Sequence, residues 1–205
     1  MNIIKPSIEI LDDLNPEQIL KKLELCGRVC YKSEDKISSE SASKFIGGII
    51  KRGHESVVEH VSFSVKFIVD RGVSHEIVRH RIASYSQEST RYCNYAKDGF
   101  NNEITVIHPS FNTWDCLLED KWKEACEWAE KYYFNLLENG ATPEEARSVL
   151  PNSLKTEIIM TANIREWRHF LKLRTSKAAH PQIREVAKML LDELTLKLPG
   201  LFDDI

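Results

Sequence analysis

Glycine is scarce in this chain, and the familiar glycine-rich motifs that bind phosphates are missing. Only eight of the 205 residues are glycine, and neither GxGxxG nor GxxxxGK[ST] occurs. Such loops hold phosphate oxygens with backbone N–H groups. If this protein takes a phosphate-bearing ligand, side chains must therefore do most of the binding.

Paired cysteines are also lacking. The five cysteines are an odd number and contain no CxxC pair; they are Cys26, Cys30, Cys93, Cys116 and Cys126. Neither a disulfide framework nor a zinc knuckle fits this spacing. We expect reduced, mostly buried thiols and no bound metal.

A basic surplus and a long apolar run are both absent. The net charge is -3 and the pI about 6.2, which disfavours nucleic acid as a partner. No apolar run approaches the roughly 20 residues that span a bilayer, and the first ten residues lack the apolar core of a signal peptide. The expected location is the cytoplasm, away from membranes.

The hydrophobic pattern predicts an α+β protein with an antiparallel sheet. We find no linker-like stretch, so one domain over 1–205 is expected. Alternating apolar residues over 61–69 give the clearest strand. Other expected strands are 2–10 and, more weakly, 154–162, with a short apolar segment at 104–107. Expected helices cover 15–29, about 39–53, 73–83, 112–139 (one long helix), a short stretch from 143, the segment after Asn163, and 181–198.

Charged and hydroxyl groups are densest in Arg79-His-Arg-Ile-Ala-Ser-Tyr-Ser-Gln-Glu-Ser-Thr-Arg91-Tyr92. This stretch contains three arginines and no lysine. The planar guanidinium group of arginine binds phosphate through two hydrogen bonds, so the composition favours an anion-binding segment. The alternative from spacing alone is that Arg79, Arg81 and Arg91 pair with surface carboxylates.

A second cluster lies further along the chain. It comprises Asn163, Arg165, Arg168, His169 and Arg174. On a helix, positions 165, 168 and 169 share one face, and Arg174 is expected just beyond the end of that helix. The alternative is an ordinary basic helix face. Arg147, shortly before Pro151, is a third, isolated candidate.

These segments resemble one known family. Arg79-His80-Arg81, seven residues and then Ser89 have the spacing of the signature motif of flavin-dependent thymidylate synthases (the ThyX family). His54-Glu-Ser-Val-Val-Glu-His60 resembles the loop before that motif. Arg147-Ser-Val-Leu-Pro151, Asn163-Ile-Arg165 and Leu173-Arg174 are similar to its later blocks. The resemblance spans about residues 50–190.

The resemblance implies the fold of a thymidylate synthase-complementing protein and a complete reaction. Such enzymes convert dUMP to dTMP, with 5,10-methylenetetrahydrofolate as carbon donor, FAD as hydride carrier and NADPH as reductant. It also implies a homotetramer whose sites are shared between subunits.

Site residues follow from the same resemblance, position by position. The FAD-binding residues would be His54, Ser56, Arg79, His80, Arg81, Gln87, Asn163, Ile164, Arg165 and His169. The dUMP-binding residues would be Glu76, Ile77, Val78, Arg79, Gln87, Glu88, Ser89, Thr90, Arg91, Arg147 and Arg174. Glu76 departs from the usual amide, and its carboxylate would repel the dUMP phosphate.

Arg174 is the expected catalytic residue, because the resemblance places it at the uracil ring. A fixed cation beside N3 and O4 would stabilise the ionised, enolate-like ring. Cys93 is the only cysteine near the motif, and no cation is evidently arranged to activate it. Ser89 would need an adjacent base, so we assign it to binding.

Two other function classes remain open from the sequence. An FAD-dependent NADPH oxidoreductase without methyl transfer would use the same arginine clusters. A nucleotide- or RNA-binding protein could stack bases on Tyr85, Tyr92 and Tyr95, although the acidic net charge argues against it.

Overall fold

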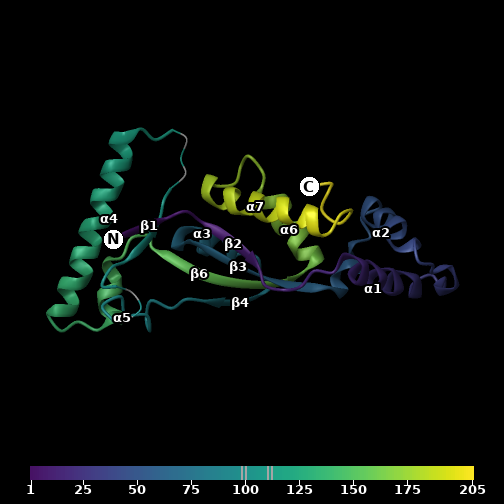
Figure 1. Ribbon diagram of the computed structural model, residues 1–205, viewed down its shortest axis with the longest axis horizontal. Coiled ribbons are helices and arrows are strands. Elements are labelled where there is room, and N and C mark those ends of the chain that lie inside the picture. Colours follow the sequence, from purple (N-terminus) through teal and green to yellow (C-terminus); the bar gives the residue numbers. More distant parts are fainter. Residues whose placement is uncertain (98, 100, 110, 112) are drawn as a thin grey trace. The chain divides into compact units, whose positions relative to one another are not determined.

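A computed structural model describes residues 1–205 apart from 98, 100, 110 and 112. It combines several helices with two small sheets, which confirms the α+β class (Figure 1). The α-helices are α1 (Pro16–Val29), α2 (Ser41–Lys51), α3 (Arg71–Ile77), α4 (Cys116–Glu138), α5 (Pro143–Ala146), α6 (Ile164–Arg174) and α7 (Pro181–Lys197). The 3₁₀ helices are η1 (Glu34–Lys36), η2 (Glu55–His60) and η3 (Arg147–Val149). The strands are β1 (Asn2–Ile4), β2 (Ser7–Ile10), β3 (Ser62–Asp70), β4 (Ser84–Gln87), β5 (Thr105–Ile107) and β6 (Lys155–Asn163).

The chain divides into two compact units. Unit 1 comprises Met1–Ser7, Phe67–Arg79 and Ser86–Ile159. Unit 2 comprises Ile8–Lys66, His80–Tyr85 and Met160–Ile205. The single domain expected over 1–205 stays a prediction.

Backbone pairing confirms the predicted antiparallel sheet. Its four strands follow the order β2-β3-β6-β4. In unit 2, Ile164 N donates to Val61 O at 2.9 Å; in unit 1, Arg71 N donates to Leu154 O at 3.1 Å. The partners thus run in opposite directions along β3 and β6. The second sheet differs from the expectation, because β1 and β5 pair in parallel, with Ile3 opposite Val106.

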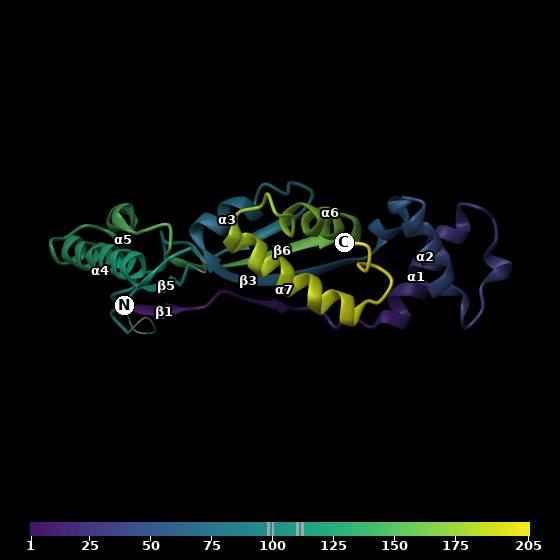
Figure 2. The ribbon, with the colours of Figure 1, turned by 90° about the horizontal axis from the view of Figure 1, so that it is seen from above.

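The core of unit 2 is built around α6 and β3. The Trp167 ring stacks on Phe63 at 5.2 Å between centroids, and its indole N–H donates to the Phe63 carbonyl at 3.2 Å. Phe170 packs edge-on against the same indole at 5.7 Å. Figures 1 and 2 both show α7 beside α6, and α2 beside α1. This packing buries one face of α6 and fixes its rotation.

The core of unit 1 lies under the long helix α4. Cys126 and Tyr133 are its buried residues, and they pack with Ile104, Val106 and Leu154. The predicted apolar series of α4 is therefore shifted, since Leu118 and Tyr132 are 46% and 55% exposed. The helix begins at Cys116, capped by Asp115; the expected start at residue 112 lies outside the described residues.

Several predicted boundaries are confirmed by their caps. The Asn15 side chain accepts from Gln18 N, Thr142 forms a capping box with Glu145, and Asn163 accepts from Glu166 N. Each satisfies backbone donors that the first helical turn leaves unpaired. The strand that was weakly predicted over residues 154–162 is confirmed as β6, which covers residues 155–163.

Other boundaries were predicted wrongly. The expected strand over 2–10 is two strands separated by Lys5-Pro6, and proline cannot donate to a ladder. The second helix begins at Ser41, slightly later than the expected start near residue 39, and Glu40 at its N-cap position makes no side-chain capping hydrogen bond. Residues 55–60 form the 3₁₀ helix η2 and not a loop, and the polar stretch 84–94 contains β4.

The expectation of free thiols is confirmed, but that of mostly buried thiols is wrong. All five cysteines are unpaired, and only Cys126 is buried, while Cys30 and Cys116 are exposed. Among the described residues, the helices contain no segment long and apolar enough to cross a membrane.

Arg168 anchors the end of the chain to α6, although the sequence suggested an exposed basic face. Its side chain is 1% exposed. It donates to Glu55 at 3.0 Å, to Asp204 at 2.8 and 2.7 Å, and to the Leu201 carbonyl. The desolvated guanidinium is therefore fully occupied by structural partners.

We predict that Arg168→Ala lowers the free energy of unfolding by about 3 kcal/mol, the lower end of the cost of breaking a buried ion pair. The lower end applies because Asp204 is half-exposed and keeps part of its hydration. Urea denaturation measures the change. Lys21→Ala is the control, since the exposed Lys21–Glu17 pair should contribute little to stability. Equal effects of the two variants would contradict the assignment.

Candidate active site

The arginine-rich motif begins just after α3. Asp70 caps this helix by accepting from Val73 N at 2.7 Å, and the helix ends at Ile77. The expected helix over 73–83 is thus too long, and Arg79-His80-Arg81 follows it as irregular backbone. Arg79 and Arg81 are exposed, whereas His80 between them is 4% exposed. Among the described residues, neither arginine has an ion-pair partner, so the alternative of surface pairing fails for both.

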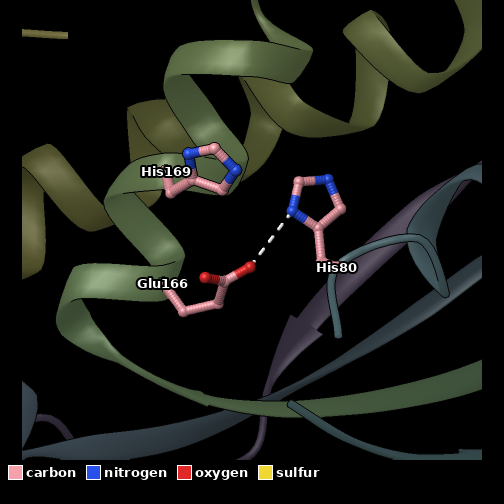
Figure 3. Close-up of side chains that lie close together, drawn as sticks. All are labelled: His80, Glu166 and His169. Atoms are coloured by element: carbon pink, nitrogen blue, oxygen red, sulfur yellow. Dashed lines mark hydrogen bonds and ion pairs between the residues drawn. The ribbon is translucent and has the colours of Figure 1, made fainter. Parts of the chain in front are cut away.

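His80 is the centre of a hydrogen-bonded group in unit 2. Its Nδ1 lies 3.2 Å from Oε1 of Glu166, as Figure 3 shows, and its Nε2 lies 3.1 Å from Nε of Arg174. The Tyr85 hydroxyl donates to the His80 carbonyl. The Phe170 ring packs edge-on against the imidazole at 4.9 Å. Both ring nitrogens and the backbone of His80 are therefore held.

The donor inventory fixes the proton on the His80 ring. An arginine Nε–H can only donate, so His80 Nε2 must accept. The neutral ring then carries its proton on Nδ1, which donates to the Glu166 carboxylate. The result is a directed series of hydrogen bonds, Arg174 to His80 to Glu166.

Burial and charge keep this imidazole neutral. The pKa of His80 is lowered to about 4, mainly by burial and further by the nearby positive charge of Arg174 and by His169. Burial also raises the pKa of Glu166, an effect that His169 opposes. Burial raises the pKa of Tyr85 to about 12, with a further contribution from Glu166, so its hydroxyl remains a donor.

His80, Glu166 and His169 also lie close enough to be considered as metal ligands. One ligand atom from each falls within 4.8 Å of the others (Figure 3). However, His80 Nδ1 carries a proton in the one neutral tautomer that satisfies both Arg174 and Glu166, and a metal would need its lone pair. The Arg174 cation beside the ring further disfavours a divalent ion. The geometry is that of a hydrogen-bonded group.

The other predicted FAD-binding residues of unit 2 are mostly exposed. His54 faces the Tyr31 hydroxyl at 3.5 Å, Ser56 lies in η2, and His169 is on α6 with its ring 5.6 Å from that of His80. Arg165 pairs with Glu59 at 2.5 Å, with 53% of its side chain exposed. Arg165 thus forms an exposed ion pair, which agrees with the alternative of an ordinary basic helix face.

Two of the predicted FAD-binding residues are occupied by the fold itself. The Asn163 side-chain oxygen caps α6, and the Ile164 N–H donates to Val61 at 2.9 Å. Ile164 is fully buried. Asn163 keeps its amide N–H groups for a ligand, but the backbone N–H of Ile164 is already used.

Predicted dUMP-binding residues gather in unit 1. The Gln87 amide donates to Ser74 Oγ at 2.9 Å and Thr156 Oγ1 at 3.2 Å. Glu88 accepts from Lys155 at 3.0 Å. Arg147 donates to Thr90 at 3.4 Å, which supports the expected nearness of these two residues.

The remaining members of that set surround Ser89. Arg91 N donates to Ser89 Oγ at 3.3 Å, and the Arg91 side chain pairs with Glu144 at 3.1 Å. The Arg91–Glu144 pair is half-exposed on both sides, so here too a surface carboxylate occupies a candidate arginine. Three further predicted residues lie in or just after α3: Glu76 (half-buried), Ile77 (fully buried) and Val78 (38% exposed).

The structure argues against a thiolate nucleophile. Burial raises the pKa of Cys93, and the negative charge of Glu88 raises it further. The positive charge of Lys155 lowers it by a smaller amount. A raised pKa lowers the thiolate fraction that nucleophilic addition requires.

Sequence reasoning did not include Lys155 in the site, and it gave Glu166 only a helix-capping role and Tyr85 only a base-stacking role. Glu166 reads as an ordinary acidic residue in a first helical turn, and only its contact with His80 shows a second use. Lys155 alternates with apolar residues along β6. Burial alone would lower its pKa, but hydrogen bonds to Glu157 and Glu88 outweigh burial and raise it.

Comparison with known proteins places this site in a family. The family model described as thymidylate synthase complementing protein matches residues 10–200. The chain therefore belongs to this family. A flavin-dependent thymidylate synthase of Pyrococcus furiosus is 38% identical over 169 residues, which cover 82% of this chain and 68% of that protein. One of Geobacter sulfurreducens is 36% identical over 187 residues, 88% of this chain and 79% of that protein.

A solved structure supports the fold independently. The crystal structure of a UMP/dUMP methylase from Streptomyces cacaoi, bound with 5-Br dUMP, superposes with a TM-score of 0.82. The superposition covers 99% of this chain and 96% of that one, at 23% sequence identity. The family resemblance seen in the motif is thus confirmed, together with the fold it implied.

We predict that His80 stays neutral from pH 8 down to about pH 5, as its pKa of about 4 requires. Between pH 6.5 and 4 the unfolded chain binds more protons at this position than the folded one, so stability falls as pH falls. NMR of the ring Cε1–H signal, assigned with His80→Gln, measures the titration. A midpoint near pH 6.5 would contradict the buried, hydrogen-bonded ring.

Proposed function

We propose that this protein catalyses the reductive methylation of dUMP to dTMP. The carbon comes from 5,10-methylenetetrahydrofolate and the two electrons from NADPH, with FAD as hydride carrier. The observation that carries the proposal is the complete motif of residues 79–92, with Arg79 and Arg81 exposed, inside the matched range 10–200. The names of the relatives, which are flavin-dependent thymidylate synthases, agree with it.

The residues of unit 2 fit an anionic flavin nucleotide without a glycine-rich loop. Arg81 is exposed, and the exposed Arg165–Glu59 pair adds little to stability. A phosphate can therefore replace the Glu59 carboxylate, because its oxygens accept the same forked hydrogen bonds. Bound FAD would supply hydride transfer, while Arg81, His54 and Ser56 of unit 2 hold and orient it.

The residues of unit 1 fit the phosphate and sugar of dUMP. Arg91 can exchange its exposed pairing with Glu144 for the phosphate, and Arg147 lies next to Thr90. The hydroxyls of Ser89 and Thr90 add donors for the remaining oxygens. Ser89 serves binding here, since the described residues place no base beside its hydroxyl.

Arg174 would stabilise the charge that develops on the uracil ring. Its guanidinium does not lose its proton, so it acts as a fixed cation and not as the base. Hydrogen bonding to the neutral His80 fixes its direction. No cysteine adduct is required, in keeping with the raised pKa of Cys93.

The proposal extends to the assembly and its location. A homotetramer with sites shared between subunits would give this 205-residue chain enough surface to enclose dUMP, folate and flavin. The unpaired cysteines agree with the reducing conditions of the cytoplasm.

We predict that the purified protein is yellow because it retains FAD, and that it forms dTMP only when dUMP, methylenetetrahydrofolate and NADPH are all supplied. Product formation is measured by chromatography, and NADPH oxidation by absorbance. Oxidation of NADPH without dTMP under all conditions would instead support the alternative, an FAD-dependent NADPH oxidoreductase. Failure to bind added FAD would overturn the proposal.

We predict that Arg174→Ala retains FAD but loses turnover by a factor on the order of 100 to 1,000, the usual effect of removing one stabilising donor. The reason is that only the charge beside the uracil ring is lost. Turnover and bound-flavin absorbance are measured together. Arg52→Ala, which removes an exposed arginine just after α2, should behave as wild type. Unchanged turnover in Arg174→Ala would remove Arg174 from the mechanism.

A further inference from the structure

We propose that Glu166 is a positioning residue that acts on Arg174 through His80, a role beyond its place in the first turn of α6. The inference rests on the proposed function, because it assumes that Arg174 serves the reaction. The inference concerns Glu166, whose role in the reaction was not part of the proposed function. The buried Glu166 carboxylate selects the tautomer of His80, and that tautomer directs the Arg174 guanidinium.

Glu166 is held in place by the start of α6. Its backbone N–H donates to the Asn163 cap at 2.9 Å, and its side chain is 8% exposed. Arg174 is the last residue of the same helix, eight positions later. His80 comes from a different part of the chain, after α3, and joins the two through contacts of 3.2 and 3.1 Å. The two ends of α6 are thus connected through one imidazole.

The direction of the two bonds gives each residue its role. A carboxylate can only accept, so it retains the proton on His80 Nδ1. Nε2 then presents a lone pair, and Arg174 Nε–H donates to it. If Nδ1 were unprotonated, Nε2 would carry the proton and face the arginine as a second donor. The guanidinium would turn away from its present direction.

The surrounding groups leave Glu166 as the side chain that can select this tautomer. His169 lies on α6 with its ring edge-on to that of His80 and 5.6 Å away between centroids; among the described residues, the hydrogen bonds of the His80 ring go to Glu166 and Arg174. Tyr85 donates to the His80 backbone and not to its ring. Phe170 contributes only an apolar ring edge.

The first test is a double-mutant cycle in the FAD-loaded protein with dUMP turnover as readout. Glu166→Gln should lower kcat by a factor on the order of 10 to 100, the usual consequence of a small misplacement, with FAD content and the KM for dUMP little changed. The Arg174→Lys side chain lacks the Nε–H group that donates to His80. In that variant, adding Glu166→Gln should lower kcat by less than about a further twofold.

Glu24→Gln is the matched control. Glu24 is also a fully buried carboxylate of unit 2, but it accepts from Arg28 and Ser41 on α1 and α2. Its loss should leave kcat unchanged. If the effects of Glu166→Gln and Arg174→Lys multiply, or if Glu166→Gln retains wild-type kcat, the inference is overturned. If Arg174→Ala itself retains turnover, the proposed role of Arg174 fails instead.

The second test uses the unmodified side chains, so it does not depend on whether Glu166→Gln folds. Nitrogen-15 NMR of ring-labelled histidine, assigned with His80→Gln, should show His80 protonated at Nδ1 and unprotonated at Nε2 near pH 7. A proton on Nε2 would overturn the inference, because Arg174 could not donate to that atom.

Discussion

The organisation of the candidate site depends on a neutral imidazole that is held between a guanidinium and a carboxylate. His80 can accept from Arg174 only while it carries a single proton, and burial beside that same cation lowers its pKa enough to keep it so. The packing that buries it comes from Phe170 and, beyond it, from the Trp167 and Phe63 stack. The hydrophobic core of unit 2 thus sets the protonation state of a residue in the signature motif.

In the proposed function, side chains take the place of a glycine-rich phosphate loop, and this has an energetic consequence. Arg91 and Arg165 are occupied by Glu144 and Glu59 in exposed pairs. Such pairs add little stability, so exchanging a carboxylate for a phosphate costs little and retains the hydrogen-bond geometry of the guanidinium. Arg168 shows the contrasting case on the same helix, where a buried guanidinium with several partners serves the fold.

Local sequence signals predicted much of the fold because they act over short distances. The period of two over 61–69 and the caps at Asn15, Thr142 and Asn163 each depend on neighbouring residues, and all were confirmed. The end of α3 was missed because residues 73–83 continue a helical pattern, whereas His80 leaves it to reach Glu166, 86 positions away. Arg174 was expected beyond α6 and is instead its last residue.

The candidate site was predicted less completely, because it depends on contacts between residues that lie far apart in the sequence. The motif identified the family and the residues on the chain that carry it, but it could not show that Arg91 and Arg165 meet carboxylates or that Ile164 has used its N–H. Glu166 gave no signal beyond helix capping, since an acidic residue in a first helical turn is common. Its role depends on a long-range contact that no spacing reveals.

A crystal structure of the protein with FAD and dUMP would test the central claim most directly. The account predicts that Arg174 contacts the uracil ring through its terminal nitrogens while its Nε remains within hydrogen-bond distance of His80 Nε2. A uracil ring far from Arg174, or a His80 ring turned away from both Arg174 and Glu166 in the ternary complex, would contradict it.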